Sequence, residues 1–81
     1  MRKYTAVETI INSRRRQLGI SSDELALATI GARTTWHCRM REPLTLKHLE
    51  TQRIFRYLHF SEEDKEAFYR AMDELAEEEK V

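Results

Sequence analysis

The sequence predicts an all-α protein, folded as a compact bundle of about five helices. Apolar residue types make up 41% of the 81 residues, which suffices for a small helical core, and they recur at helical spacing in several segments. One proline and two glycines leave little room for the turns of a β fold. At this length we expect a single domain over residues 1–81.

The first helix is expected from about Thr5 to Leu18. Gly19 ends it, because glycine adopts the backbone conformation of a helix end without strain. Three consecutive arginines occupy its last turn, where cations complement the negative end of the helix dipole. The residues expected on its inner face are Val7, Ile10, Ile11 and Leu18.

The segment 21–41 is expected to form two short helices joined by a tight turn. Ser21 and Glu24 have the spacing of a reciprocal capping box, so the first of these helices begins at Ser22. Ala26 is expected to point inward, and its small side chain lets the following helix cross close by.

Gly31 marks the turn into the next helix, which is expected from about Arg33 to Arg41. Its inward anchors are Trp36 and Met40, one helical turn apart. Each residue rotates the helix by about 100°, so the side opposite these anchors is polar and basic. The rotation places Thr34, His37, Cys38 and Arg41 on this side, and Arg33 lies at the exposed N-terminal edge of the helix. We call these five residues the outer face.

Two helices joined by a tight turn, the second with a cationic outer face, have the geometry that places a recognition helix in the DNA major groove. The chain also resembles the lambda-repressor-like (Cro/C1-type, XRE-like) helix-turn-helix regulators of the phage type. The resemblance covers roughly Arg14 to Leu58 and is carried by the residues RRRQLGISSDELA and, after them, RTTWHCRM. Three positions depart from the family pattern: Ile30 replaces the usual turn glycine, Ser22 a frequent glutamine, and Arg39 a usually apolar residue.

The resemblance implies a transcriptional regulator, most simply a Cro-like repressor, that binds a specific operator in double-stranded DNA as a homodimer. Such a protein acts in the cytoplasm of a bacterial cell or a phage-infected host. The outer face would then contact base edges, with Arg33 and Arg41 suited to bidentate contacts with guanine. Expected phosphate contacts are Arg15, Ser21, Ser22 and Lys47.

Charge is segregated along the chain, although the formal net charge is zero. Residues 1–59 carry 11 Lys or Arg against 5 Asp or Glu, whereas residues 60–81 carry 3 against 9. A basic body of this kind is typical of proteins with a polyanionic partner. The acidic end is expected to point away from the DNA.

The third helix is expected to end near Arg41, because Pro43 disfavours a helical conformation in Glu42 before it. Thr45 is then expected to cap a fourth helix. The apolar residues expected along its inner face are Leu46, Leu49, Ile54 and Leu58.

The last helix is expected over about residues 62–79, and it is strongly acidic. Ser61 caps it, and Asp64 supplies the reciprocal half of the capping box. Its apolar stripe is a candidate dimer interface; alternatively, the stripe closes the core over the first and fourth helices. The candidate interface comprises Phe68, Tyr69, Met72 and Leu75.

The sequence offers little to support catalysis or ligand chemistry. It has no paired-carboxylate, phosphate-loop or nucleophile motif, and its single cysteine excludes an intrachain disulfide. The three histidines and Cys38 do not have the spacing of a zinc site. We therefore expect no enzyme, no metal, no cofactor and no small-molecule ligand. We also expect no membrane association, since no apolar run has signal-peptide or membrane-span length.

A second interpretation is a helical protein-interaction module that keeps the helix-turn-helix fold without binding DNA. A phage-type inhibitor or antirepressor would belong to this class. The near-neutral isoelectric point of about 6.8 and the displaced turn glycine favour it. The basic outer face of the third helix counts against it.

Overall fold

The computed structural model describes residues 5–79, and within this range the chain is entirely α-helical apart from its loops and one turn of 3-10 helix. The prediction of an all-α bundle of about five helices is therefore confirmed. The elements are α1 (Ala6–Gln17), α2 (Ser22–Thr29), α3 (Arg33–Arg41), η1 (Pro43–Thr45), α4 (His48–Tyr57) and α5 (Glu62–Glu79).

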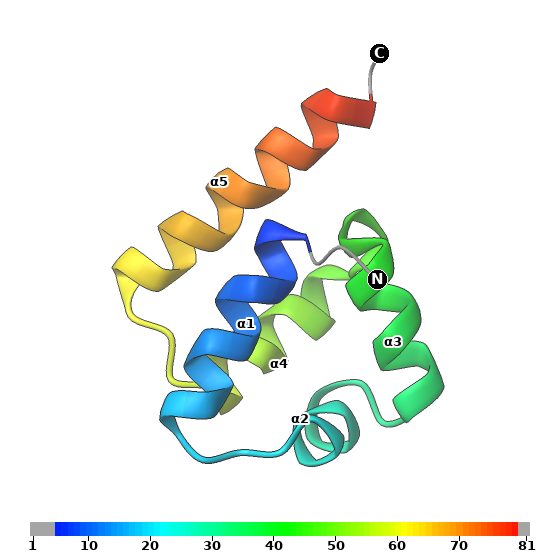
Figure 1. Cartoon of the computed structure of the whole chain (residues 1–81), viewed down its shortest axis with the longest axis vertical. Coiled ribbons are helices and arrows are strands. Elements are labelled where there is room, and N and C mark those ends of the chain that lie inside the picture. Colours follow the sequence, from blue (N-terminus) through cyan, green and yellow to red (C-terminus); the bar gives the residue numbers. More distant parts are fainter. Residues whose placement is uncertain (1–4, 80–81) are drawn as a thin grey trace.

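The helices surround a single core, with α1 in the middle of the fold (Figure 1). The long helix α5 packs along α1 and touches η1, while α2 packs against both α4 and α3. Figure 1 shows α2 at one end of the molecule and the C-terminal end of α5 at the other. This arrangement leaves the outer side of α3 and the last turns of α5 free of other helices.

The core takes side chains from all five helices. Its aromatic part is centred on Phe55, whose ring stacks on Phe60 at 5.1 Å between centroids and meets the edge of Phe68 at 5.0 Å. Pairs of this geometry add about 0.5–1.5 kcal/mol each to the free energy of burial. The buried apolar residues are Val7, Ile11, Leu25, Ala26, Trp36, Met40, Ile54, Phe55, Leu58, Phe60, Phe68 and Ala71.

The predicted starts of α2 and α5 are confirmed. At α5, the Asp64 amide donates to Ser61 Oγ at 3.1 Å, and the Ser61 amide donates to Asp64 Oδ2 at 3.0 Å. At α2, the Glu24 amide donates to Ser21 Oγ at 3.0 Å. The second hydrogen bond predicted for the capping box of α2, from the Ser21 amide to the Glu24 carboxylate, is wrong. This carboxylate instead accepts from the Tyr57 hydroxyl at 2.5 Å and so joins α2 to α4.

The predicted start of the fourth helix is wrong. Pro43 begins a 3-10 turn, and the Thr45 hydroxyl donates to the Glu42 carbonyl at 2.6 Å instead of capping a helix. The proline ring fixes φ near the value of a first helical turn, which explains why this short turn forms. The helix α4 itself begins at His48, with Lys47 as its N-cap.

Two leucines predicted on inner faces are exposed. Leu49 is 59% exposed, because it lies five residues before Ile54 and so about 140° around α4 from that buried residue. Leu18 is 37% exposed, since α1 ends at Gln17 and Leu18 follows its last turn. Both leucines therefore add apolar surface to the outside of the molecule.

Candidate nucleic-acid interface

The helices α2 and α3 are joined by a tight turn at Ile30–Ala32. Gly31 has φ of 99°, in the left-handed region that glycine adopts without strain, and its amide donates to the Ala26 carbonyl at 2.9 Å. Ile30 before it keeps a right-handed helical conformation. The turn therefore needs its glycine at position 31, one place after the position usual in the family that the sequence resembles.

Buried anchors fix the orientation of α3. Trp36 is 3% exposed and Met40 is 1% exposed, so both predicted anchors are confirmed. Across the turn, Thr29 is buried and its hydroxyl donates to the Leu25 carbonyl at 2.7 Å. With this side of α3 fixed in the core, the opposite side must face solvent.

The five residues of the outer face are all exposed: four as the helical rotation predicts, and Arg33 at the N-terminal edge of α3. They give α3 a surface of hydrogen-bond donors and positive charge, with one thiol. No other residue in the described part of the chain buries this surface. Its exposure is confirmed, whereas contact with bases stays a prediction.

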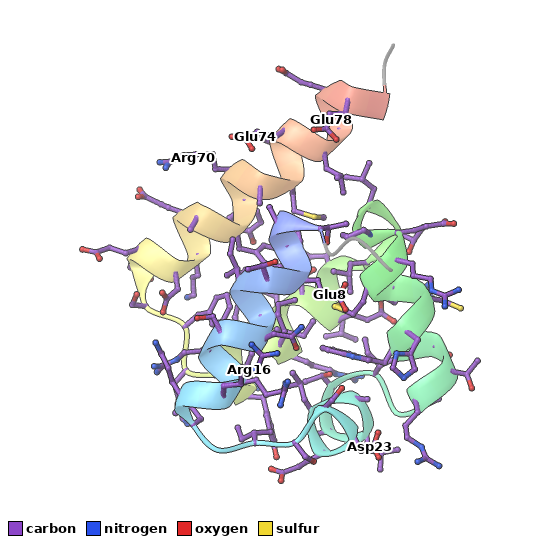
Figure 2. All side chains as sticks on the ribbon, viewed as in Figure 1. Glu8, Arg16, Asp23, Arg70, Glu74 and Glu78 are labelled. Atoms are coloured by element: carbon purple, nitrogen blue, oxygen red, sulfur yellow. The ribbon has the colours of Figure 1, made fainter. Side chains whose placement is uncertain are left out.

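The two arginines of the outer face differ in their surroundings. Arg33 Nη1 lies 3.4 Å from Asp23 Oδ2, in an ion pair whose side chains are 65% and 63% exposed. Figure 2 shows Asp23 on α2, at the same end of the molecule. Such exposed pairs contribute about 0–1 kcal/mol, so Arg33 can leave Asp23 for another anion at little cost. Arg41 has no ion-pair partner among residues 5–79.

A better-shielded ion pair joins α3 to the start of α4. Arg39 Nε donates to Glu50 Oε1 at 3.0 Å, and the side chains are only 22% and 13% exposed. The same carboxylate oxygen accepts from the Lys47 amide at 3.0 Å. Burial tends to raise the pKa of Glu50, but the hydrogen bonds and charges of Lys47 and Arg39 outweigh it, so the pKa is lowered.

In the sequence, Arg39 stood out only because it occupies a position that is usually apolar in the family that the chain resembles. The signal for its partner was available, because Glu50 stands three residues after the N-cap of α4, the position of a capping carboxylate. The Glu50 carboxylate thus binds both Arg39 of α3 and the Lys47 amide at the N-cap of α4. These two bonds fix the position of Lys47 relative to the outer face.

Replacing Glu50 with glutamine is expected to lower the free energy of unfolding by about 1 kcal/mol at neutral pH, through loss of the charged hydrogen bonds. A lowered folded-state pKa stabilises the protein above the unfolded-state value, near 4.5, and this contribution is lost as the pH falls through the folded-state pKa. The stability difference between wild type and Glu50→Gln should therefore shrink on acidification below about 4.5. Urea unfolding at several pH values measures it; a difference that stays constant would contradict the lowered pKa.

The candidate phosphate contacts differ in their exposure, unlike the residues of the outer face. Lys47 is exposed at the N-cap of α4, although its amide is already bonded to Glu50. Ser21 is exposed and Ser22 is half-buried, both at the start of α2. Ser21 and Ser22 therefore precede α3 in the chain, and Lys47 follows it. Contact of these residues with phosphate stays a prediction.

Arg15, also predicted to contact phosphate, has an internal role. Its Nη1 donates to the Ile20 carbonyl at 2.9 Å, and its Nε donates to Asn12 Oδ1 at 3.2 Å. These bonds close the loop between α1 and α2. Arg14 has a similar structural role that the sequence did not reveal. Its Nε donates to the Leu58 carbonyl at 2.8 Å and so joins α1 to the end of α4.

The candidate dimer interface on α5 is only partly exposed. Phe68 is 0% exposed and has no surface to offer a partner, so this residue was assigned wrongly and belongs to the core. The cause is Phe55, which faces it across the fold. Tyr69 is 45% exposed, while Met72 and Leu75 are half-buried. The alternative, in which the stripe closes the core, is therefore correct for Phe68 at its beginning.

Comparisons with protein-family models, curated proteins and solved structures find no match to this chain. No helix in the described range is long and apolar enough to cross a membrane. In the same range, no cluster of three or more His, Cys, Asp or Glu side chains is placed to bind a metal ion. A function must therefore be argued from the geometry of the chain itself.

Proposed function

We propose that this protein is a sequence-specific, double-stranded DNA-binding transcriptional regulator that inserts α3 into the major groove. The observation that carries the proposal is the division of α3 into two sides. Trp36 and Met40 hold one side in the core, while the outer face presents five exposed side chains, two of which are arginines. A B-DNA major groove, about 12 Å wide, admits one helix with its side chains. A bacterial or phage-infected cell is the compartment we propose for it.

In this proposal Arg33 and Arg41 contact guanine bases from the two ends of α3. They are eight positions apart, which corresponds to about 12 Å along the helix. Base pairs rise by about 3.4 Å, so the two guanidinium groups reach bases about three to four pairs apart. Thr34, His37 and Cys38 lie between them and face the intervening bases.

The ends of neighbouring helices are proposed to hold the DNA backbone. Lys47 is exposed beside α3, and the Arg39–Glu50 ion pair fixes its position relative to the outer face. Ser21 and Ser22 stand at the start of α2, where the positive end of the helix dipole attracts a phosphate. Phosphate contacts at these positions would set the register of α3 on the duplex.

Affinity for random-sequence duplex DNA over a salt series tests the proposal. Each neutralised phosphate is expected to add about −0.9 to the slope of log affinity against log salt concentration, because counterions are released. A steep negative slope is the expected result. A flat response would contradict DNA binding and favour the protein-interaction module.

Single substitutions separate base contacts from phosphate contacts. Arg41→Ala is expected to relax base preference at defined positions by about 1–3 kcal/mol, since a bidentate contact distinguishes guanine from other bases. Lys47→Ala is expected to weaken binding to all sequences alike and to reduce the salt slope by about 1. Binding to duplexes with single base changes measures both.

The matched control is Arg70→Ala, which removes an exposed arginine from α5, far from the outer face (Figure 2). It should leave both affinity and base preference unchanged. Equal losses on every sequence for Arg41→Ala and Lys47→Ala would mean that α3 makes only an electrostatic contact.

One observation favours the protein-interaction module as a second candidate. Leu27 on α2 is 57% exposed and Leu49 on α4 is 59% exposed. Exposed leucines on neighbouring helices offer apolar surface to a protein partner. The salt series distinguishes the two candidates, because an apolar contact is much less sensitive to salt than a phosphate contact.

A further inference from the structure

A surface groove lies where the ends of α1 and α4 meet α2. Its volume is about 610 Å³, and its apolar lining includes Leu18, Ile20 and the Tyr57 ring. Arg53 and Arg56 of α4 border the same groove. Apolar surface beside two arginines suits a partner segment that is both apolar and acidic.

The two arginines at this groove carry positive charge that no ion pair neutralises among the described residues. Arg53 and Arg56 are exposed, and neither has an ion-pair partner among residues 5–79. Glu24, which reaches Tyr57 in the groove, already accepts the hydrogen bond from the tyrosine hydroxyl. The two arginines are three residues apart on a helix, so they are neighbours on its surface.

The C-terminal end of α5 has the complementary character. Glu74 and Glu78 are exposed, one helical turn apart, and have no ion-pair partner in the described part of the chain. Half-buried Leu75 lies beside them on the helix. Figure 2 shows Glu74 pointing away from the rest of the fold and Glu78 at the far end of α5. The carboxylates are four positions apart and the arginines three, so the members of each pair are neighbours on the surface of their helix.

The end of α5 cannot enter the groove of its own chain. The groove includes His59, which lies just before α5, and the helix runs from there toward the opposite end of the molecule (Figure 1). Sixteen residues separate Glu62 from Glu78, so the helix places them about 24 Å apart. Only another copy of the chain can bring this acidic end to the groove.

We propose that two copies pair by exchanging these ends, each placing residues 74–78 of α5 in the groove of the other. Glu74 and Glu78 face the partner's Arg53 and Arg56, and Leu75 covers part of the apolar lining. Two-fold symmetry makes the contact twice and closes the pair, so no further copies are added. None of these residues is a candidate DNA contact, and the pairing stands independently of DNA binding.

Charge exchange tests the pairing. One variant carries Arg53→Glu and Arg56→Glu, and the other carries Glu74→Lys and Glu78→Lys. Wild type is expected to be a dimer by sedimentation velocity without DNA. Each variant alone is expected to raise the dimer Kd by at least about 100-fold, because like charges then face one another in both contacts. An equimolar mixture is expected to form a heterodimer with a Kd within about tenfold of wild type, because both contacts again join opposite charges.

The control carries Glu63→Lys and Glu66→Lys, the same charge change at exposed positions nearer the start of α5. It should remain a dimer. Circular dichroism verifies that each variant is folded, and Arg53→Gln with Arg56→Gln replaces the groove variant if that one loses its helical signal. A monomeric wild type, variants that dimerise like wild type, dissociation of the control, or a mixture that stays monomeric would each overturn the exchange. None of these outcomes bears on DNA binding by α3, which is measured with other residues.

Discussion

Replacing Trp36 with alanine is expected to lower the free energy of unfolding by about 3–5 kcal/mol, a large share of the stability of a small domain. Trp36 is 3% exposed and is the largest side chain holding α3 in the core. Its loss leaves a cavity that the surrounding helices cannot close, because they are also tied through the α2–α3 turn and the Arg39–Glu50 ion pair. Urea unfolding followed by circular dichroism measures the change.

The matched control for this substitution is His37→Ala, which truncates the next residue on the exposed side of α3. It should change stability by less than about 0.5 kcal/mol. A Trp36→Ala protein that unfolds like wild type but no longer binds DNA would mean that Trp36 faces the ligand. The assignment of the outer face would then be rotated.

Phe68→Ala is expected to have a similarly large effect, about 3–5 kcal/mol of unfolding free energy. Phe68 is 0% exposed, and its ring meets the edges of Phe55 at 5.0 Å and Phe60 at 6.4 Å. Removing it takes the main contact of α5 away from the aromatic part of the core. Thermal and urea unfolding at low protein concentration measure the loss without a contribution from dimerisation.

Tyr69→Ala serves as the comparison, since Tyr69 is the next residue of α5 and is 45% exposed. Its ring keeps an edge contact with Phe55 at 5.6 Å, so we expect a loss of about 1 kcal/mol. If Phe68→Ala instead left stability unchanged and dissociated a dimer, Phe68 would be an interface residue, as the sequence suggested.

Local signals in the sequence predicted most of the fold. Ser61 and Asp64 mark the start of α5, and Gly19 and Gly31 mark the ends of α1 and α2, because caps and positive φ angles depend on neighbouring residues alone. The burial of Trp36 and Met40 followed from helical rotation. The exposure of Thr34, His37, Cys38 and Arg41 followed from the same rotation, and that of Arg33 from its place at the start of α3.

Apart from the start of the fourth helix and the two exposed leucines, the incorrect or missed predictions concern contacts between residues far apart in the chain. Glu24 bonds Tyr57 across 33 positions, and Arg14 bonds the Leu58 carbonyl across 44. Such bonds depend on how the helices pack, which helical periodicity does not determine. Phe68 was ambiguous for the same reason, since a stripe on one helix is core or surface according to what another helix places against it.

Selection of bound sequences from a randomised duplex pool tests DNA recognition by α3 most directly. Wild-type protein is expected to enrich a defined motif containing guanines about three to four base pairs apart, and Arg41→Ala is expected to lose the preference at one of those positions. A bound pool with the same base composition at every position as the starting pool would contradict the account.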